Sequence, residues 1–390
     1  MLALKLALRN LLGAGLRTWL NVLVLSFSFV LIIWHKGFLQ GWNVEARRDM
    51  INWEIGGGQY WHHSYDPYDP FTLSESHAQI PSLLRAQIDA GELTPILMAQ
   101  ATIYPEGRMQ NIILKGLDPR QSILQLPGAL LDTDVDEIPA IIGTRMARNT
   151  KLEPGDYITV RWRDAAGVFD AAEIKIAGLF KTNVPTVDLN QIWVPLPRLQ
   201  TMLGLPGEAT LLVAGEGMEA PIQLAQWPFQ GHARLLAEID EIIRQKSIGG
   251  SIIYFLLLSL ALLAIFDTQV LSIFRRQKEI GTHIALGMTR RQVIGLFTVE
   301  GAMHAVLAAV LAAVYGFPLL YLQATRGIKL PGSFDDYGLT LAERIYPAYS
   351  FGLVMGTTLL VLVSTTIVSF LPTRRITRMK PTDALRGKIQ

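Results

Sequence analysis

AYSFGLVMGTTLLVLVSTTIVSFL, residues 348–371, is the stretch that decides the architecture of this chain. It contains no Asp, Glu, Lys, Arg or His. A helix needs about 20 predominantly apolar residues to cross the hydrocarbon core of a bilayer, and an uncharged helix of that length is stable in few other places. We therefore expect residues 348–371 to span a membrane.

Three earlier stretches have the same character, although each contains ionisable side chains, which in the first are His35 and Lys36 near its end. Asp267 lies in the second stretch, and Glu300 and His304 lie one helical turn apart in the third. A cleaved signal peptide is the alternative for the first stretch, but its apolar core is longer than is typical and no small-residue cleavage site follows it. The earlier spans are expected at residues 19–39, 252–274 and 293–322.

The basic residues of the short segments predict which side of the membrane each segment faces, because Lys and Arg near the ends of a span stay cytoplasmic. The N-terminal segment, the segment after the second span and the C-terminal tail are all basic. The loop after the third span balances its basic residues with acidic ones. We therefore expect both termini in the cytoplasm, and that loop and the long insert outside it.

Composition agrees with a membrane protein that carries a large aqueous domain. Hydrophobic residues make up 50% of the chain and charged residues 17%, which is more charge than an all-membrane protein carries. The formal net charge of +2 argues against a nucleic-acid partner. The chain has no cysteine, which excludes disulfides, thiolate metal sites and cysteine nucleophiles.

The insert between the first two spans is long enough for a domain or for two small lobes. Ile158, Val160 and Trp162 alternate with polar residues, which is the pattern of a half-buried strand, and RDAAG at 163–167 predicts a hairpin turn after it. Helices are expected at 74–90 and 196–203. Further strands are expected at 96–104, 110–114, 173–176, 191–194 and 210–213.

The expected fold is a membrane protein with four transmembrane α-helices and a large α+β extracytoplasmic domain inserted between helices 1 and 2. The expected boundaries are 1–41 for an N-terminal elbow and helix 1, 42–246 for the inserted domain, 247–274 for helix 2, 275–291 for a cytoplasmic coupling segment, 292–322 for helix 3, 323–347 for an extracytoplasmic loop, 348–372 for helix 4 and 373–390 for the tail.

Aromatic residues gather at the start of the insert, just outside the membrane. Trp42, Trp53, Tyr60 and Trp61 could form a surface for a lipid-like or protein cargo, or could equally belong to an aromatic belt or a packed core. The nearby histidines do not repeat the spacing of a known metal site, so we expect no metal.

The segment RRQKEIGTHIALGMTRRQV, residues 275–293, has the local signals of a helix, a tight turn and a second helix. Ile280, Ile284 and Met288 recur at four-residue spacing and form a short apolar face. Gly287 can supply the left-handed residue that ends the first helix, and Thr289 with Gln292 has the spacing of a capping box. A solvated basic loop is the alternative.

The same segment resembles the signature of FtsX-like ABC permeases, a family that includes macrolide-exporter and lipoprotein-releasing permeases. LALRNLLGAGLRTWLNVL at 6–23 resembles the N-terminal elbow and first span of that family, and PTRRITRMKPTDALRG at 372–387 resembles its tail. Three further stretches resemble its MacB-like extracytoplasmic domain. They are IIGTRMARNTKLEPGDYITVRW at 141–162, IKIAGLF at 174–180 and IWVPLPRLQTMLGLPG at 192–207.

The resemblance implies that about 279–289 is a coupling helix that docks on a separate ATPase dimer. That partner would bind ATP and Mg, and this chain would bind no cofactor. The chain departs from the usual pattern at Lys278, Met288 and Asp267, which puts the contacts there in doubt. The residues expected to serve ATPase coupling are Arg276, Lys278, Glu279, Ile280, Gly281, Ile284, Ala285, Leu286, Gly287, Met288, Thr289 and Arg290.

The family implies a non-catalytic permease in the bacterial inner membrane, paired with an identical or related second permease, its large domain periplasmic. It would convert ATPase closure into movement of that domain, by mechanotransmission, to extract or export a lipoprotein or another amphiphilic cargo. The chain lacks the G-x-x-x-x-G-K-[ST] phosphate loop, so the energy would come from another chain. A signalling or scaffold protein that regulates a periplasmic enzyme or adaptor is the alternative. A secondary transporter that uses Asp267, Glu300 and His304 is disfavoured, because the sequence predicts only four spans.

Overall fold

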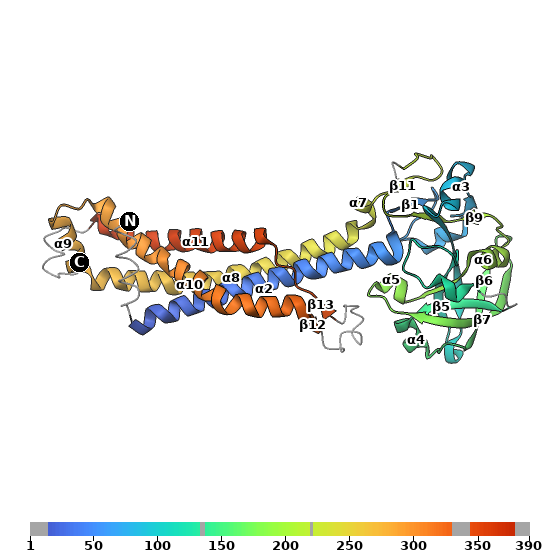
Figure 1. The fold of residues 1–390 in the computed structure, drawn as a ribbon, viewed down its shortest axis with the longest axis horizontal. Coiled ribbons are helices and arrows are strands. Elements are labelled where there is room, and N and C mark those ends of the chain that lie inside the picture. The colour runs from blue at the N-terminus through green and yellow to red at the C-terminus, as the bar shows by residue number, and fades with distance from the viewer. Residues whose placement is uncertain (1–14, 133–136, 219–220, 330–343, 379–390) are drawn as a thin grey trace. The chain divides into compact units, whose positions relative to one another are not determined.

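The computed structural model describes residues 15–132, 137–218, 221–329 and 344–378, and it divides the chain into two compact units (Figure 1). Among the described residues, the membrane unit comprises 15–43, 243–329 and 344–378, and the inserted unit comprises those within 44–242. The expected elbow at 1–14, the centre of the loop at 330–343 and the tail from 379 onward lie outside the described residues.

Four helices of the described chain are long and apolar enough to cross a membrane. Each contains all or most of one of the expected apolar stretches, the fourth helix beginning at Phe351 rather than at 348, so the prediction of four candidate spans is confirmed. They are α2 (Gly15–Met50), α8 (Ala237–Arg275), α10 (Arg290–Arg326) and α11 (Phe351–Thr373). Shorter elements of the membrane unit are α9 (Gln277–Ala285), β12 (Ile328–Lys329), β13 (Arg344–Ile345) and the 3-10 helix η6 (Arg374–Arg378).

Small residues let the membrane helices approach closely. A Cβ added to Gly301 of α10 would lie 2.3 Å from the Ser369 Oγ of α11 and 2.8 Å from the Gln269 Nε2 of α8. A Cβ on Gly316 would lie 2.7 Å from Cγ2 of Val30 in α2. Lipid tails are as apolar as Leu, so close van der Waals packing is a main source of helix association in a bilayer.

Polar side chains also join the membrane helices to one another. Asn21 of α2 donates to the hydroxyl of Thr268 in α8 at 2.5 Å, and the hydroxyls of Thr298 in α10 and Thr373 in α11 lie 3.1 Å apart. A polar group in hydrocarbon has no water to bind, so these bonds fix which helix faces meet.

The inserted unit is built around a nine-stranded sheet whose order is β11-β1-β10-β3-β4-β8-β5-β7-β6. Its strands are β1 (Gly58–Trp61), β3 (Leu93–Ile103), β4 (Gln110–Leu117), β5 (Ile138–Gly143), β6 (Tyr157–Arg163), β7 (Phe169–Phe180), β8 (Gln191–Pro195), β10 (Leu211–Ala214) and β11 (Phe229–Gln230). A separate pair joins β2 (Ala78–Gln79) to β9 (Glu208–Ala209).

The sheet closes on itself, because β6 pairs with β7 on one side and with residues 101–103 of β3 on the other. Six strands therefore form a ring, namely β3, β4, β8, β5, β7 and β6. The predicted alternation along β6 is confirmed: Ile158, Val160 and Trp162 are buried in the core of the ring and the residues between them are exposed. A closed ladder leaves these strands without free edges.

Helices cover this sheet, and one expected helix is wrong in its first half. The helix α6 (Leu196–Leu203) forms where it was expected. Residues 74–90 do not form one helix, because α3 (Ser82–Asp89) begins only after Pro81 and the ring of a proline disfavours helix in the residue before it. The other short helices are η1 (Ile51–Ile55), η2 (Pro70–Ser74), η3 (Pro105–Gly107), η4 (Gly128–Leu131), α4 (Thr144–Thr150), α5 (Pro185–Asp188) and α7 (His232–Leu235).

A buried lysine gives the inserted unit a dependence on pH. Lys115 of β4 is only 6% exposed, its Nζ lies 3.6 Å from Oε1 of Glu54, and it lies 5.0 Å from the ring centroid of Trp193. Burial lowers the pKa of Lys115, and the charge of Glu54 opposes that shift. Below about 10.4, the ordinary value for lysine, there is a window in which the unfolded chain holds this proton and the folded chain does not.

We expect the free energy of unfolding of the inserted unit to rise with pH in that window, because the unfolded state then binds more protons. One such group contributes at most about 1.4 kcal/mol per pH unit. Lys115→Met should remove this part of the profile, measured by denaturant unfolding of the detergent-solubilised chain between pH 7 and 10. Lys151→Met is the control, since the Lys151 side chain is 70% exposed. A wild-type slope in Lys115→Met would contradict the assignment.

Candidate functional site

The segment that joins α8 to α10 forms a helix and a tight turn, and its local structure follows from its sequence. The helix α9 ends at Ala285, earlier than the expected end near 289, and Gly287 follows with φ of 97°. The hydroxyl of Thr289 accepts from the backbone of Gln292 at 3.3 Å, and the Gln292 side chain accepts from the backbone of Thr289 at 2.8 Å. The predicted left-handed glycine and capping box are both confirmed.

The inner face of α9 is packed into the membrane unit. Ile280 is fully buried and Gly281 is buried beside it. Ile284 and Met288 are partly buried against the same cluster. This cluster, which we call the α9 seat, contains Ile273, Ile280, Val293, Ile294, Phe297 and Ile376. These side chains hold the helix in place and cannot reach a partner protein.

The outer face of α9 and its turn are exposed, and at its end is a large apolar side chain. Leu286 is 80% exposed. Seven exposed residues of α9 and the turn after it make up what we call the α9 tip. They are Lys278, Thr282, Ala285, Leu286, Gly287, Thr289 and Arg290.

Arg276 lies between α8 and α9 and binds two carboxylates. Its Nη1 donates to both carboxylate oxygens of Glu300, at 2.7 and 2.8 Å. Its Nε and Nη2 donate to Glu279 at 2.6 and 2.5 Å. These bonds lower the pKa of Glu279 below its ordinary value and raise the pKa of Arg276. The sequence did not indicate the pair with Glu300, because 24 residues separate the partners.

The three polar residues expected inside the spans occupy different environments. Glu300 is bound by Arg276, so the pair with His304 that the one-turn spacing allows is not what holds this carboxylate. His304 is buried, and its Nδ1 lies 3.1 Å from the backbone oxygen of Gly301. Asp267 lies on an exposed side of α8. The structure therefore does not gather these three residues into one site.

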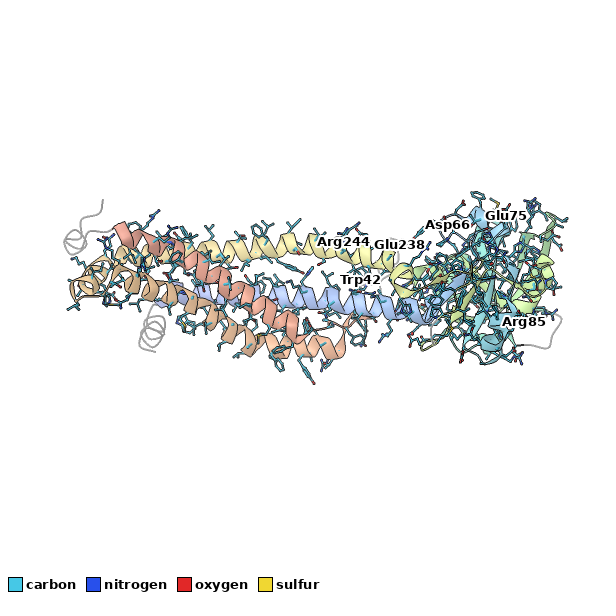
Figure 2. The ribbon with its side chains drawn as sticks, turned by 90° about the horizontal axis from the view of Figure 1, so that it is seen from above. Trp42, Asp66, Glu75, Arg85, Glu238 and Arg244 are labelled. Carbon is cyan, nitrogen blue, oxygen red and sulfur yellow. The ribbon has the colours of Figure 1, made fainter. Side chains whose placement is uncertain are left out.

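The aromatic residues expected to form a cargo surface are mostly packed. Tyr60 is fully buried in β1, with its ring centroid 5.0 Å from that of Phe229, which corrects its assignment to a surface. Trp53 stacks on Phe180 at 5.7 Å, and Trp61 meets Tyr65 edge to face at 5.1 Å. Trp42 lies on α2 (Figure 2), where Lys246 Nζ lies 3.6 Å from its ring centroid.

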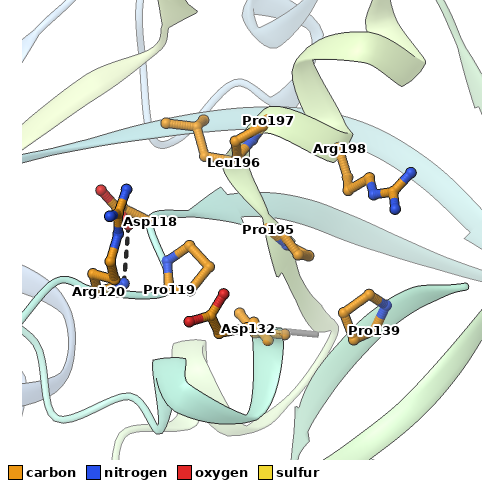
Figure 3. A pocket seen from close by; sticks show the side chains of 10 residues that line it. Asp118, Pro119, Arg120, Asp132, Pro139, Pro195, Leu196, Pro197 and Arg198 are labelled. Carbon is orange, nitrogen blue, oxygen red and sulfur yellow. Dashed lines mark hydrogen bonds between the residues drawn. The ribbon is translucent and has the colours of Figure 1, made fainter. Parts of the chain in front are cut away.

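A shallow pocket of about 350 Å³ lies in the inserted unit at the ends of β4 and β8 (Figure 3). Asp118 beside it accepts from the backbone N–H of Arg120 at 2.9 Å, which holds the turn after β4. Sequence reasoning did not find this pocket, because pairing between distant strands brings its walls together. It is lined by Asp118, Pro119, Arg120, Leu131, Asp132, Pro139, Pro195, Leu196, Pro197 and Arg198.

The comparisons with known proteins bear on the membrane unit first. Residues 251–381, which run from α8 through α9, α10 and α11, match the family described as FtsX-like permease, C-terminal. Residues 251–381 belong to the FtsX-like permeases. The α9 seat and the α9 tip both lie inside this FtsX-like domain, and three of the four described helices that are apolar enough to cross a membrane lie at least partly within it.

Two known proteins are similar to this chain, one over about a third of its length and the other over three quarters. The macrolide export ATP-binding/permease protein MacB of Nitrobacter winogradskyi is 30% identical over 123 residues, which is 32% of this chain and 17% of that protein. The lipoprotein-releasing system transmembrane protein LolC of Xylella fastidiosa is 22% identical over 326 residues, which is 75% of this chain and 76% of that protein. Both names describe membrane transport proteins, and the chain spans only about a sixth of the first.

A solved structure, the extracellular domain of the noncanonic ABC-type transporter YknZ from Gram-positive bacteria, covers 42% of this chain and 83% of its own chain at 14% identity. The TM-score is 0.26, which is too low for the likeness to carry an argument about the fold.

Proposed function

We propose that this chain is the permease subunit of an ABC transporter that receives a separate ATP-hydrolysing subunit on the α9 tip. The observation that carries the proposal is the two-sided structure of α9 within the FtsX-like domain. Its inner face is buried in the α9 seat, whereas Leu286 and its neighbours are exposed. A helix that is fixed on one side and apolar at its free end is suited to docking and to transmitting a push.

The proposal places the inserted unit on the opposite side of the membrane from α9. Closure of the ATPase dimer would move α9 with the helices that hold it, and the inserted unit would act on cargo at or above the outer leaflet. The alignment with LolC covers most of the chain and supports a lipoprotein or a similar amphiphile as the cargo. A second permease, identical or related, would complete the complex with two ATPase subunits.

Topology is the first test, and a chain with no cysteine makes it direct. Val168→Cys places one thiol in the turn between β6 and β7, where Val168 is 59% exposed, and Thr282→Cys places one on the exposed side of α9. In intact spheroplasts, a membrane-impermeant maleimide should label the first variant and not the second. Permeabilised cells should give labelling of both. Labelling of both variants in intact spheroplasts would contradict the proposed orientation.

The partner is the second test. The chain purified from its native membrane should retain a polypeptide that carries G-x-x-x-x-G-K-[ST] and hydrolyses ATP. The purified permease should in turn stimulate that hydrolysis when the two are mixed in lipid nanodiscs. Failure of any such polypeptide to bind the wild-type chain would refute the transporter proposal.

A further inference from the structure

We propose that Arg276 is a positioning residue that locks α9 to α10 through Glu300, and that it does not contact the ATPase. The inference deepens the proposed function and rests on it for the role of α9, but the lock itself is a property of this chain alone. It removes Arg276 from the set of docking residues that the sequence suggested and adds Glu300 to the coupling mechanism.

The donors of Arg276 are used within this chain. Three of its nitrogen atoms donate four hydrogen bonds of 2.5 to 2.8 Å to Glu279 and Glu300, and the guanidinium lies 4.7 Å from the ring centroid of Phe297 in the α9 seat. Nε and Nη2 pair with the two oxygens of Glu279 as a fork, which fixes angle as well as distance, whereas Nη1 alone binds both oxygens of Glu300. A guanidinium used in this way has little left to offer a partner protein.

The burial of the pair makes it sensitive to substitution. The side chain of Glu300 is 12% exposed and that of Arg276 is 22% exposed. The Nε2 of His283 lies 3.7 Å from Oε1 of Glu279. Glu300 therefore depends on Arg276 for its charge compensation among the contacts that the structure gives it, and a half-buried carboxylate without compensation is costly.

The backbone of Arg276 makes it a joint between helices. Its N–H donates to the oxygen of Ser272 at 3.0 Å, as in a continuing α8, while its own oxygen accepts from Ile280 at 3.0 Å, as in a starting α9. Its φ and ψ of −103° and 20° break the helix between them. One residue thus ends α8, starts α9 and binds α10 through Glu300.

The apolar α9 seat cannot supply the same connection. Hydrophobic contact is non-directional, so Ile280 and Phe297 could slide against each other with little change in buried area. The two bonds from Arg276 Nη1 to Glu300 oppose displacement of α9 from α10, and the fork to Glu279 fixes the same guanidinium to α9. With these bonds intact, a push on the α9 tip displaces α10. Without them, α9 moves before α10 does.

The test compares Glu300→Gln with Glu300→Asp, because glutamine removes the negative charge whereas aspartate keeps it. Spin labels on Thr282→Cys and Val310→Cys would report the α9–α10 distance by pulsed electron resonance in nanodiscs, on an otherwise cysteine-free full chain. Both sites are exposed. Glu300→Gln should broaden the distance distribution at least twofold, and Glu300→Asp should restore a width close to that of the wild type.

The second readout separates locking from docking. With the co-purified ATPase, Glu300→Gln and Arg276→Lys should bind that subunit with a Kd within about twofold of the wild-type value. The stimulation of ATP hydrolysis by the permease should fall at least tenfold in both variants. An unchanged distance distribution in Glu300→Gln would overturn the proposal. So would loss of ATPase binding by Arg276→Lys with the distribution unchanged. If no ATPase binds even the wild type while Glu300→Gln still broadens the distribution, the proposed function fails and the lock stands.

Discussion

Leu286→Asp is expected to abolish recruitment of the ATPase subunit while leaving the permease folded. Leu286 is 80% exposed, so a carboxylate there meets water in the free chain and costs little stability. In the proposed complex the same carboxylate would be buried in an apolar groove. Truncation of a central apolar anchor costs about 2–4 kcal/mol, which weakens binding by roughly 30-fold to 1000-fold. The measurement is the amount of ATPase that co-purifies with the variant and its Kd in nanodiscs.

Val168→Asp is the matched control for Leu286→Asp. Val168 is also an exposed apolar residue, at 59%, but it belongs to the hairpin of the inserted unit. It should co-purify with the ATPase as the wild type does. Equal binding by Leu286→Asp and the wild type would show that the α9 tip is not the docking surface.

Gly301→Leu should destabilise the membrane unit. Even the Cβ of a new side chain would overlap Ser369 Oγ at 2.3 Å, with Gln269 Nε2 on the other side at 2.8 Å. Forcing extra atoms into a packed core typically costs about 1–3 kcal/mol and a full leucine at a three-helix contact more. A loss of about 3 kcal/mol corresponds to a fall in Tm of roughly 6–12 °C for a unit of this size.

Gly356→Leu is the control for the glycine at the helix contact. Gly356 lies within α11, on its exposed side, and a Cβ there meets nothing within 4 Å. Fluorescence-detected size exclusion after heating in detergent would compare the two variants. Equal melting of Gly301→Leu and Gly356→Leu would mean that close packing at Gly301 does not hold the bundle together.

Local signals in the sequence were sufficient to predict the helices and turns of the site. An uncharged apolar run, a glycine at 287 and the Thr289–Gln292 pair each act over a few residues, and the structure has the elements that they predict. The burial of Ile280 likewise follows from four-residue spacing. Such features depend on helix geometry alone, which is why one sequence is enough to find them.

Contacts between distant segments could not be found in the same way. The hydrogen bonds between Arg276 and Glu300 join residues separated by 24 positions, and nothing in the spacing selects Glu300 over His304 as the partner of Arg276. The closure of β6 onto β3 depends on register between strands about 60 residues apart. Tyr60 illustrates the same limit, because an aromatic residue near a membrane is equally plausible in a core and on a surface until its neighbours are known.

The closed ladder of the inserted unit has a consequence for assembly. Since β6 returns to β3, the described part of the nine-stranded sheet presents only β11, a strand of two residues, as a free edge. Proteins crowded on a membrane surface risk joining edge to edge through unpaired backbone groups, which leads to strand exchange and aggregation. In the proposed complex, two such units would therefore contact each other through side chains rather than through a shared sheet, so they could separate without breaking backbone pairing between strands.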